Sequence, residues 1–281
     1  MRLLASTLAF ALALASAAEA QDALDARAAY VERRGLLAAD AHCHVLAPSL
    51  RGAIEVGALQ TRGALLRAGW TSAQTNALEE ATVAAARTRA CDDPRTASAV
   101  AQARASFGQW ANAGSMAFPG WERTWTARRA TIGWRLRQDV SAPRPATFGV
   151  RQSESGRQSL ILALPVPRSA PPPSSVRLVM RDRARAPARD ISLTTRIANG
   201  LAAGAPSPTT SRSYNGVYSS ERNNGGATAV FTFPDAAFGQ MLALDPRESV
   251  ELRLERGRAS ERIFVEVGDI AAARAFLTLD R

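Results

Sequence analysis

The residues best suited to chemistry are two cysteines and two histidines, the only ones in the chain. Three of them are consecutive, His42, Cys43 and His44, and the fourth is Cys91. Imidazole nitrogens and thiolate sulfurs are ligands for zinc and related metals, and a cysteine beside a histidine can act as a nucleophile. Two cysteines can also form a disulfide. These residues therefore allow three interpretations: a metal site, a catalytic cysteine or a disulfide.

The spacing of these residues favours the disulfide. On a helix, positions i and i+2 point about 200° apart, so His42 and His44 cannot bind one ion by themselves. On a strand they would share a face, but Cys43 would point away from it. The chain has no Cys-x-x-Cys redox pair and no Cys-x-x-Cys-His haem motif. We expect a Cys43–Cys91 disulfide and no cofactor, with His42 and His44 as weak candidates for a metal site.

A pair of adjacent carboxylates, Glu79 and Glu80, offers a second kind of chemistry. Glycosidases use two carboxyl groups on opposite sides of a cleft, one of them as general acid. A simpler role for these two is to pair with Arg87 or with neighbouring surface charge. They support only an alternative function, a hydrolase acting on a cell-wall glycan.

Aromatic and basic residues alternate between residues 114 and 130. Trp121 and Trp125 have the i, i+4 spacing of one helix face, and Arg128 and Arg129 follow one turn later. A short helix here would stack indoles and a guanidinium group along one side. One reading is a buried joint between two domains, and the other is an exposed surface for a glycan or an anionic partner. These four residues are the candidate ligand surface.

Familiar catalytic signatures are absent from the sequence. It contains no phosphate-binding glycine loop, no Gly-x-Ser-x-Gly motif and no His-Glu-x-x-His motif. Two histidines are also a small supply for acid–base catalysis. Enzymatic activity stays uncertain, and a protein that is not an enzyme is favoured.

The first residues have the pattern of a signal peptide. Arg2 precedes an apolar run from Leu3 to Ala15, and Ala18-Glu19-Ala20 fits a small-x-small cleavage site before Gln21. The run is shorter than the roughly 20 apolar residues of a membrane-spanning helix. We expect residues 1–20 to be removed, leaving a periplasmic or secreted protein without a transmembrane segment.

Residues 21–113 have a helical pattern of apolar positions, with Gly35 ending the first helix and Ser49 capping the third. The expected helices are 22–34, 36–46, 49–68, 72–90 and 94–110. Cys43 lies on an apolar face and Cys91 follows another, as expected for a bridge between packed helices. Closing the loop between them would be worth about 4 kcal/mol by the chain-entropy estimate.

After residues 114–130, residues 131–281 change to the alternation typical of strands. Strands are expected near 132–136, 146–152, 158–166, 176–180, 191–197, 229–233, 250–254 and 263–267, with a loop over 199–227. Short helices are expected from Pro234 and, capped by Asp269, over 270–277. The resulting fold class is α+β: an N-terminal disulfide-stapled helical bundle followed by an antiparallel β-sandwich-like domain with short helices.

The order strand–helix–strand–strand–helix over the last fifth of the chain resembles the end of the invasion-associated locus B group of exported bacterial proteins. The resemblance rests on the order of elements in residues 229–277. It implies an exported protein and assigns no site residues.

The charge is strongly basic and is spread along the chain. The formal net charge is +10, and every basic residue is an arginine. Outside the cytoplasm the anionic partners at hand are envelope polymers, lipid headgroups and other proteins. Nucleic acid is not expected, because no basic groove with interleaved aromatic residues is evident. We expect an exported envelope protein that binds another protein or an anionic envelope polymer.

Overall fold

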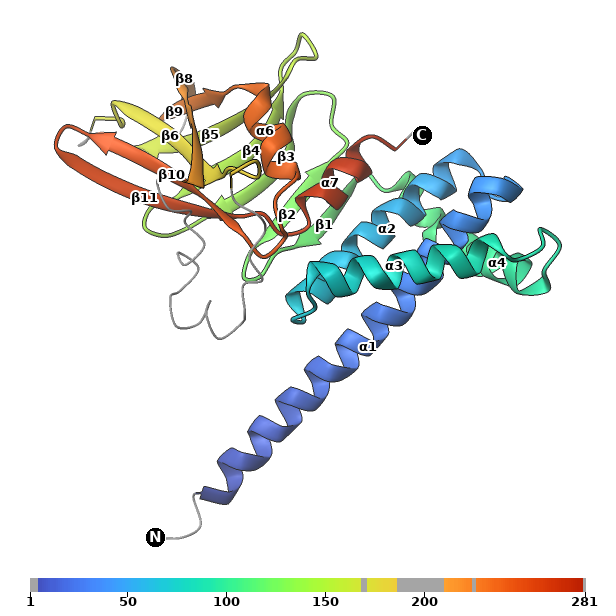
Figure 1. Ribbon diagram of the computed structural model, residues 1–281. Coiled ribbons are helices and arrows are strands. Elements are labelled where there is room, and N and C mark those ends of the chain that lie inside the picture. The colour runs from blue at the N-terminus through green and yellow to red at the C-terminus, as the bar shows by residue number, and fades with distance from the viewer. Residues whose placement is uncertain (1–4, 168–170, 186–209, 224–225, 280–281) are drawn as a thin grey trace. The chain divides into compact units, whose positions relative to one another are not determined.

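The computed structural model describes residues 5–167, 171–185, 210–223 and 226–279, with side chains from residue 23 onward except that of Asn223. It confirms the mixed α+β fold class, with four N-terminal helices followed by antiparallel sheets and short helices (Figure 1). Two compact units divide the chain between Ala111 and Asn112. The predicted strand 191–197 and the start of the predicted loop lie outside the described residues.

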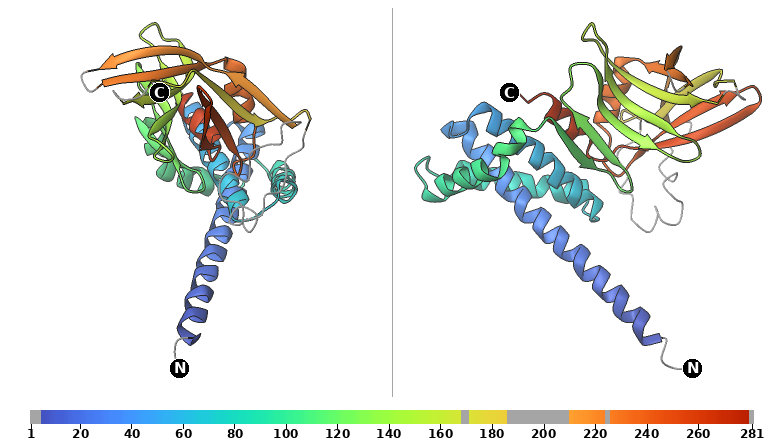
Figure 2. Two further views of the ribbon diagram at one scale, coloured as in Figure 1. Left: turned by 90° about the vertical axis from the view of Figure 1, so that its left-hand side faces the viewer. Right: turned by 180° about the vertical axis from the view of Figure 1, so that it is seen from behind.

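The helical unit is built around one long helix. Figure 2 shows α1 as uninterrupted, followed along the chain by three shorter helices: α1 (Ala5–Cys43), α2 (Pro48–Arg67), α3 (Ser72–Arg87) and α4 (Pro94–Asn112). Both α2 and α3 pack against α1. Phe107 of α4 contacts Gly57 of α2 and lies beneath the Arg33 guanidinium, 5.1 Å from ring centroid to Cζ.

Gly35 and Ser49 do not have the helix-end roles that the sequence predicted. Gly35 does not end a helix, because residues 35–40 are buried and their packing outweighs the roughly 1 kcal/mol penalty of an internal glycine. Ser49 is not a cap: Ala47 is the N-cap residue and Pro48 occupies the first turn, where its missing N–H costs nothing. Residues 5–20 of the predicted leader lie in α1, and the removal of the leader stays a prediction.

The second unit contains two antiparallel sheets. The larger follows the order β1-β2-β3-β4-β5-β9-β8, and the smaller follows β11-β10-β6-β7. The strands are β1 (Ser115–Pro119), β2 (Thr124–Arg128), β3 (Gly133–Val140), β4 (Ala146–Gln152), β5 (Gln158–Val166), β6 (Ser175–Arg181), β7 (Ser211–Asn215), β8 (Val217–Asn223), β9 (Gly226–Phe233), β10 (Ser249–Arg256) and β11 (Ala259–Glu266). The predicted loop is wrong where β7 and β8 form, and Gly216 alone separates these strands of different sheets.

The core of this unit is aromatic and lies against α7 (Ile270–Leu277). Trp125 meets Phe148 with a centroid distance of 6.4 Å, and Phe148 meets Phe233 at 6.1 Å. Phe276 of α7 packs on Phe118 of β1 at 5.7 Å. The other short helix is α6 (Asp235–Leu242). The order β9-α6-β10-β11-α7 agrees with the predicted C-terminal pattern, although the Asp269 side chain makes no cap hydrogen bond.

No helix among the described residues combines the length and the apolar character that crossing a membrane requires.

Candidate functional site

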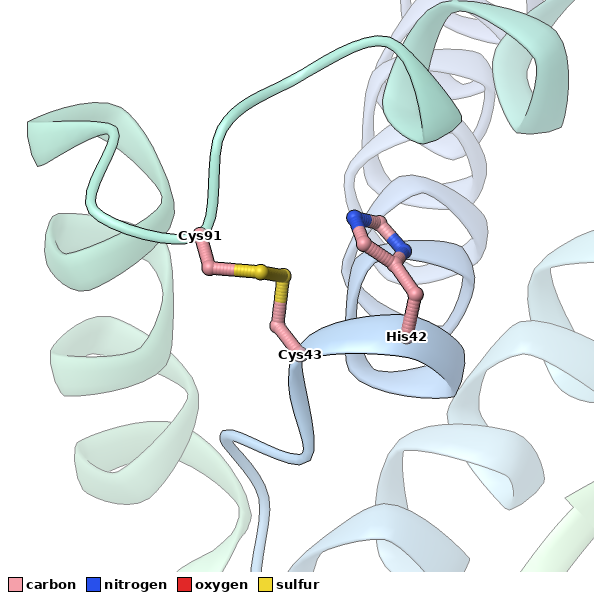
Figure 3. A group of neighbouring side chains, drawn as sticks. All are labelled: His42, Cys43 and Cys91. Carbon is pink, nitrogen blue, oxygen red and sulfur yellow. A yellow bond between two sulfur atoms is a disulfide. The ribbon is translucent and has the colours of Figure 1, made fainter.

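The predicted disulfide is present. Cys43 ends α1 and Cys91 lies in the turn between α3 and α4, with their Cα atoms 5.4 Å apart (Figure 3). His42 and His44 are both exposed. His44 has a φ of 52°, a left-handed conformation that follows the end of the helix. The bridge therefore ties the end of α1 to the α3–α4 turn at the surface of the helical unit.

The four residues of the candidate Trp/Arg surface do not lie together on one exposed helix. They lie on the β1–β2 hairpin, and Trp125 is fully buried, with its Nε1–H donating to the carbonyls of Glu266 and Val267 at 2.9 Å each. The predicted helix is wrong because Pro119-Gly120 makes a turn and residues 124–128 alternate between core and surface. Trp125 therefore cannot contact a ligand.

Of the two predicted arginines, only Arg128 is exposed. Arg129 instead lies over the Phe276 ring, 4.3 Å from Cζ to the centroid, and its Nε–H donates to the Phe276 carbonyl at 3.1 Å. It therefore fastens β2 to α7. Trp121 is half-buried in the β1–β2 turn, where its backbone N–H donates to the Glu266 carboxylate at 2.6 Å.

A surface hollow on strands β1 to β3 brings Arg128 together with two residues that the sequence interpretation did not select. It has a volume of about 500 Å³, and its lining includes Arg128, Trp134 and Arg137 with Ser115 and Thr126. Thr126 pairs with Arg137 across β2 and β3, whereas the neighbouring pair, Ala127 and Leu136, is buried. We call Arg128, Trp134 and Arg137 the arginine–tryptophan hollow.

Trp134 reaches this surface because β3 is irregular. The register of β3 on β4 shifts between Trp134 and Leu136. Gly149, the partner of Arg137 on β4, approaches β3 so closely that a Cβ there would collide with the Leu136 carbonyl oxygen. A bulge turns successive side chains away from simple alternation. Ile132 is 57% exposed and Leu136 is fully buried, although the sequence pattern placed both on one face with Trp134.

The charge in the hollow is only partly compensated. Arg137 Nε lies 3.5 Å from an Asp139 carboxylate oxygen, and both side chains are about half exposed or more. Arg128 forms no ion pair with any residue in the described part of the chain. Two guanidinium groups beside one indole are suited to an anionic ligand that also offers an apolar face.

Glu79 and Glu80 have different surroundings. Glu79 accepts a hydrogen bond of 2.6 Å from the Tyr30 hydroxyl and pairs with Arg34, whereas Glu80 is exposed. Both carboxylate residues and the predicted partner Arg87 line a hollow of about 650 Å³, but no ion pair joins Arg87 to either of them in the part of the chain that the structure describes. Burial, and then the bond to Glu79, raises the pKa of Tyr30 well above its ordinary value of 10.0. Tyr30 is therefore a fixed donor that holds Glu79 in place.

Glu79 also lines a neighbouring hollow of about 410 Å³ together with Glu55 and Arg62. Two carboxylate residues therefore line one cavity, which is one feature that the hydrolase alternative requires. Both Arg34 and Tyr30 also line it, so the Glu79 carboxylate is already occupied by two donors of the helical unit.

Comparisons of the chain with protein-family models, with curated proteins and with solved structures found no match.

Proposed function

We propose that this protein is an exported envelope protein that works by binding, and that its arginine–tryptophan hollow holds an anionic envelope polymer. The observation that carries the proposal is the meeting of Arg128 and Arg137 with Trp134 in one surface hollow. Guanidinium groups bind carboxylate or phosphate in a fixed geometry, and an indole packs against the apolar face of a sugar ring. The half-compensated charge leaves room for a ligand anion.

Three further features support export and an anionic partner. The Cys43–Cys91 disulfide is of the kind that persists in oxidising compartments such as the periplasm or the exterior. The net charge of +10 attracts polyanions over a distance of about 10 Å at moderate salt. The signal-peptide pattern of residues 1–20 is typical of proteins that are exported from the cytoplasm. Export is tested by sequencing the amino terminus of protein recovered from cells, which we expect to begin at Gln21.

The binding proposal is tested by titrating the protein with alginate, a carboxylated polysaccharide, and with neutral dextran. We expect affinity for alginate that falls as salt is raised, and none for dextran. The double variant Arg128→Gln/Arg137→Gln should bind at least about tenfold more weakly, which corresponds to 1.4 kcal/mol. Teichoic-type polyphosphate as a second probe distinguishes phosphate from carboxylate ligands.

The matched control removes the same charge elsewhere. Arg183 and Arg258 are exposed, and Arg183→Gln/Arg258→Gln changes the net charge equally without touching the hollow. This control should retain affinity to within about twofold, because only the long-range field changes. Equal losses in the two double variants would show that binding reports overall charge, and the hollow would then have no special role.

A second candidate is a hydrolase acting on a cell-wall glycan, favoured by the one cavity that Glu55 and Glu79 share. Release of reducing sugar from purified cell-wall glycan is the measurement. Wild-type activity that Glu55→Gln and Glu79→Gln each abolish, while Glu261→Gln retains it, would establish this candidate. Wild-type protein without activity would remove it.

A further inference from the structure

An imidazole stands beside the disulfide. A ligand atom of His42 and the sulfurs of Cys43 and Cys91 all lie within 4.8 Å of one another. Figure 3 shows the His42 ring next to the bridge, one residue before Cys43. Sulfur and imidazole nitrogen are the preferred ligands of zinc, and three protein ligands with a water are a recurrent zinc coordination. The cluster therefore has the donor atoms of a metal site. While the two sulfurs are bonded to each other, they are not thiolates and do not bind the ion.

The hydrogen bonding of His42 leaves one ring nitrogen available to a metal ion. Nδ1 lies 3.2 Å from the Ala38 carbonyl oxygen, one helical turn earlier. A carbonyl can only accept, so Nδ1 carries the proton in this contact and Nε2 keeps its lone pair. Metal-binding histidines commonly have this arrangement, in which a backbone carbonyl orients the ring and fixes its tautomer.

The bridge lies where a reductant and an ion can reach it. Cys91 and His42 are exposed and Cys43 is half-buried. Cys43 is the last residue of α1, and Cys91 belongs to a turn rather than to a packed helix. Two thiolates that bind one ion lie farther apart than two bonded sulfurs. This movement would change only a helix end and a turn, and the buried core residues would stay in place.

We propose that reduction converts this bridge into a zinc site formed by Cys43, Cys91 and His42. A dithiol donor transfers two electrons and two protons to the disulfide and itself becomes a disulfide. Zn²⁺ then displaces both thiol protons, binds the two thiolates and His42 Nε2, and keeps a water as its fourth ligand. The end of α1 and the α3–α4 turn are thus held together in both redox states, by a covalent bond in one and by a metal ion in the other.

The experiment uses the full chain, oxidised or reduced with a phosphine that is then removed under anaerobic conditions. Co²⁺ serves as the spectroscopic probe, and Zn²⁺ is titrated against a chromogenic chelator. The reduced protein should bind one equivalent, with a thiolate-to-cobalt absorption band that Zn²⁺ abolishes. The oxidised protein should give no such band. Far-UV circular dichroism of the reduced protein should retain the helical signal.

Three variants distinguish a built site from adventitious thiols. His42→Ala should weaken zinc binding by about tenfold or more, whereas His44→Ala, which alters a histidine two residues away, should bind as wild type. Cys43→Ser/Cys91→Ser should bind no metal. Equal affinities for His42→Ala and His44→Ala would overturn the assignment of His42. A reduced protein that binds no more zinc than the serine variant, or that unfolds before binding, would overturn the site.

Discussion

The carboxylate of Glu266, at the end of β11, accepts a hydrogen bond of 2.6 Å from the backbone N–H of Trp121 in the β1–β2 turn. It also accepts from the backbone N–H groups of Glu122 and Arg123 at 3.0 and 3.1 Å. Glu266 is 1% exposed. A Cβ on Gly120 would collide with this carboxylate, so the turn requires a glycine there. One buried acid thus joins the two sheets of the β-rich unit.

Replacing this acid should destabilise the β-rich unit strongly. Glu266→Gln replaces a carboxylate oxygen with an amide donor next to three backbone N–H groups, so we expect the free energy of unfolding to fall by about 2 kcal/mol, as for lost hydrogen bonds to a charged group. Chemical denaturation followed by tryptophan fluorescence measures the change. Glu261→Gln on the same strand is the control. Its partner Arg144 lies 3.5 Å away at a partly exposed position, so the loss should stay below about 1 kcal/mol.

The two tryptophans that the sequence pattern paired should respond differently to substitution. Trp125→Phe removes the buried donor to the Val267 carbonyl and leaves a void, so the free energy of unfolding should fall by about 1–3 kcal/mol. Trp121→Phe keeps the backbone bond to Glu266 at a half-buried position and should change it by about 0.5 kcal/mol or less. Urea titration of both variants gives the comparison. Similar losses would mean that the side chain of Trp121 is as important to the core as that of Trp125.

Removal of the disulfide should act on the helical unit alone. For Cys43→Ser/Cys91→Ser we expect the free energy of unfolding to fall by about 4 kcal/mol, because the unfolded chain gains conformational entropy when the loop is no longer closed. The helical signal in far-UV circular dichroism reports this transition. Reductant should shift the wild-type transition toward that of the variant and leave the variant unchanged. A reductant-insensitive wild type would contradict the expectation.

Alkaline pH should weaken the helical unit through Tyr30. Its pKa in the folded chain is raised by burial and by Glu79, whereas in the unfolded chain it ionises near the ordinary value of 10.0. Above pH 10 the unfolded chain therefore holds fewer protons, and the free energy of unfolding falls as the pH rises. The stabilisation is complete below pH 10 and is lost above it. Because the chain contains no lysine, few other groups titrate in this range.

Denaturation of the helical unit at a series of pH values between about 9 and 11 measures the slope that proton linkage predicts. Tyr30→Phe should be less stable at neutral pH, since it loses the bond to Glu79, but should show a smaller alkaline slope. Tyr218→Phe, at a residue that is 48% exposed in the other unit, should keep the wild-type slope. The same slope in Tyr30→Phe and wild type would show that ionisation of Tyr30 does not cause the alkaline loss of stability.

The sequence predicted best where structure is local. Residues 250–254 and 263–267 alternate and are joined by a short turn, and they form the β10–β11 hairpin with Val250 opposite Val265. The disulfide was predictable for a different reason, since a chain with two cysteines offers only one pairing. Both inferences needed only neighbouring residues or a count.

The candidate site was less predictable, because it depends on contacts between distant residues. The spacing of Trp121 and Trp125 fits a helix as well as it fits a turn and a strand, and only packing on Phe148 decides between them. The register shift beside half-buried Trp134 lies next to a close approach of Gly149 from the neighbouring strand, and the sequence around Trp134 does not indicate it. Tyr30 and Glu79 are 49 residues apart, and neither sequence neighbourhood indicates the other.

The passage of the chain through Gly216 has a consequence for how the β-rich unit comes apart. β7 hydrogen-bonds to β6 in the small sheet and β8 to β9 in the large one, and one residue separates them. A Cβ on Gly216 would press on Phe231 and Phe233, so this crossing point is itself packed against the core. Separation of β7 from β6 should therefore disturb the pairing of β8 with β9, and the reverse. We expect the two sheets to unfold together in one cooperative transition.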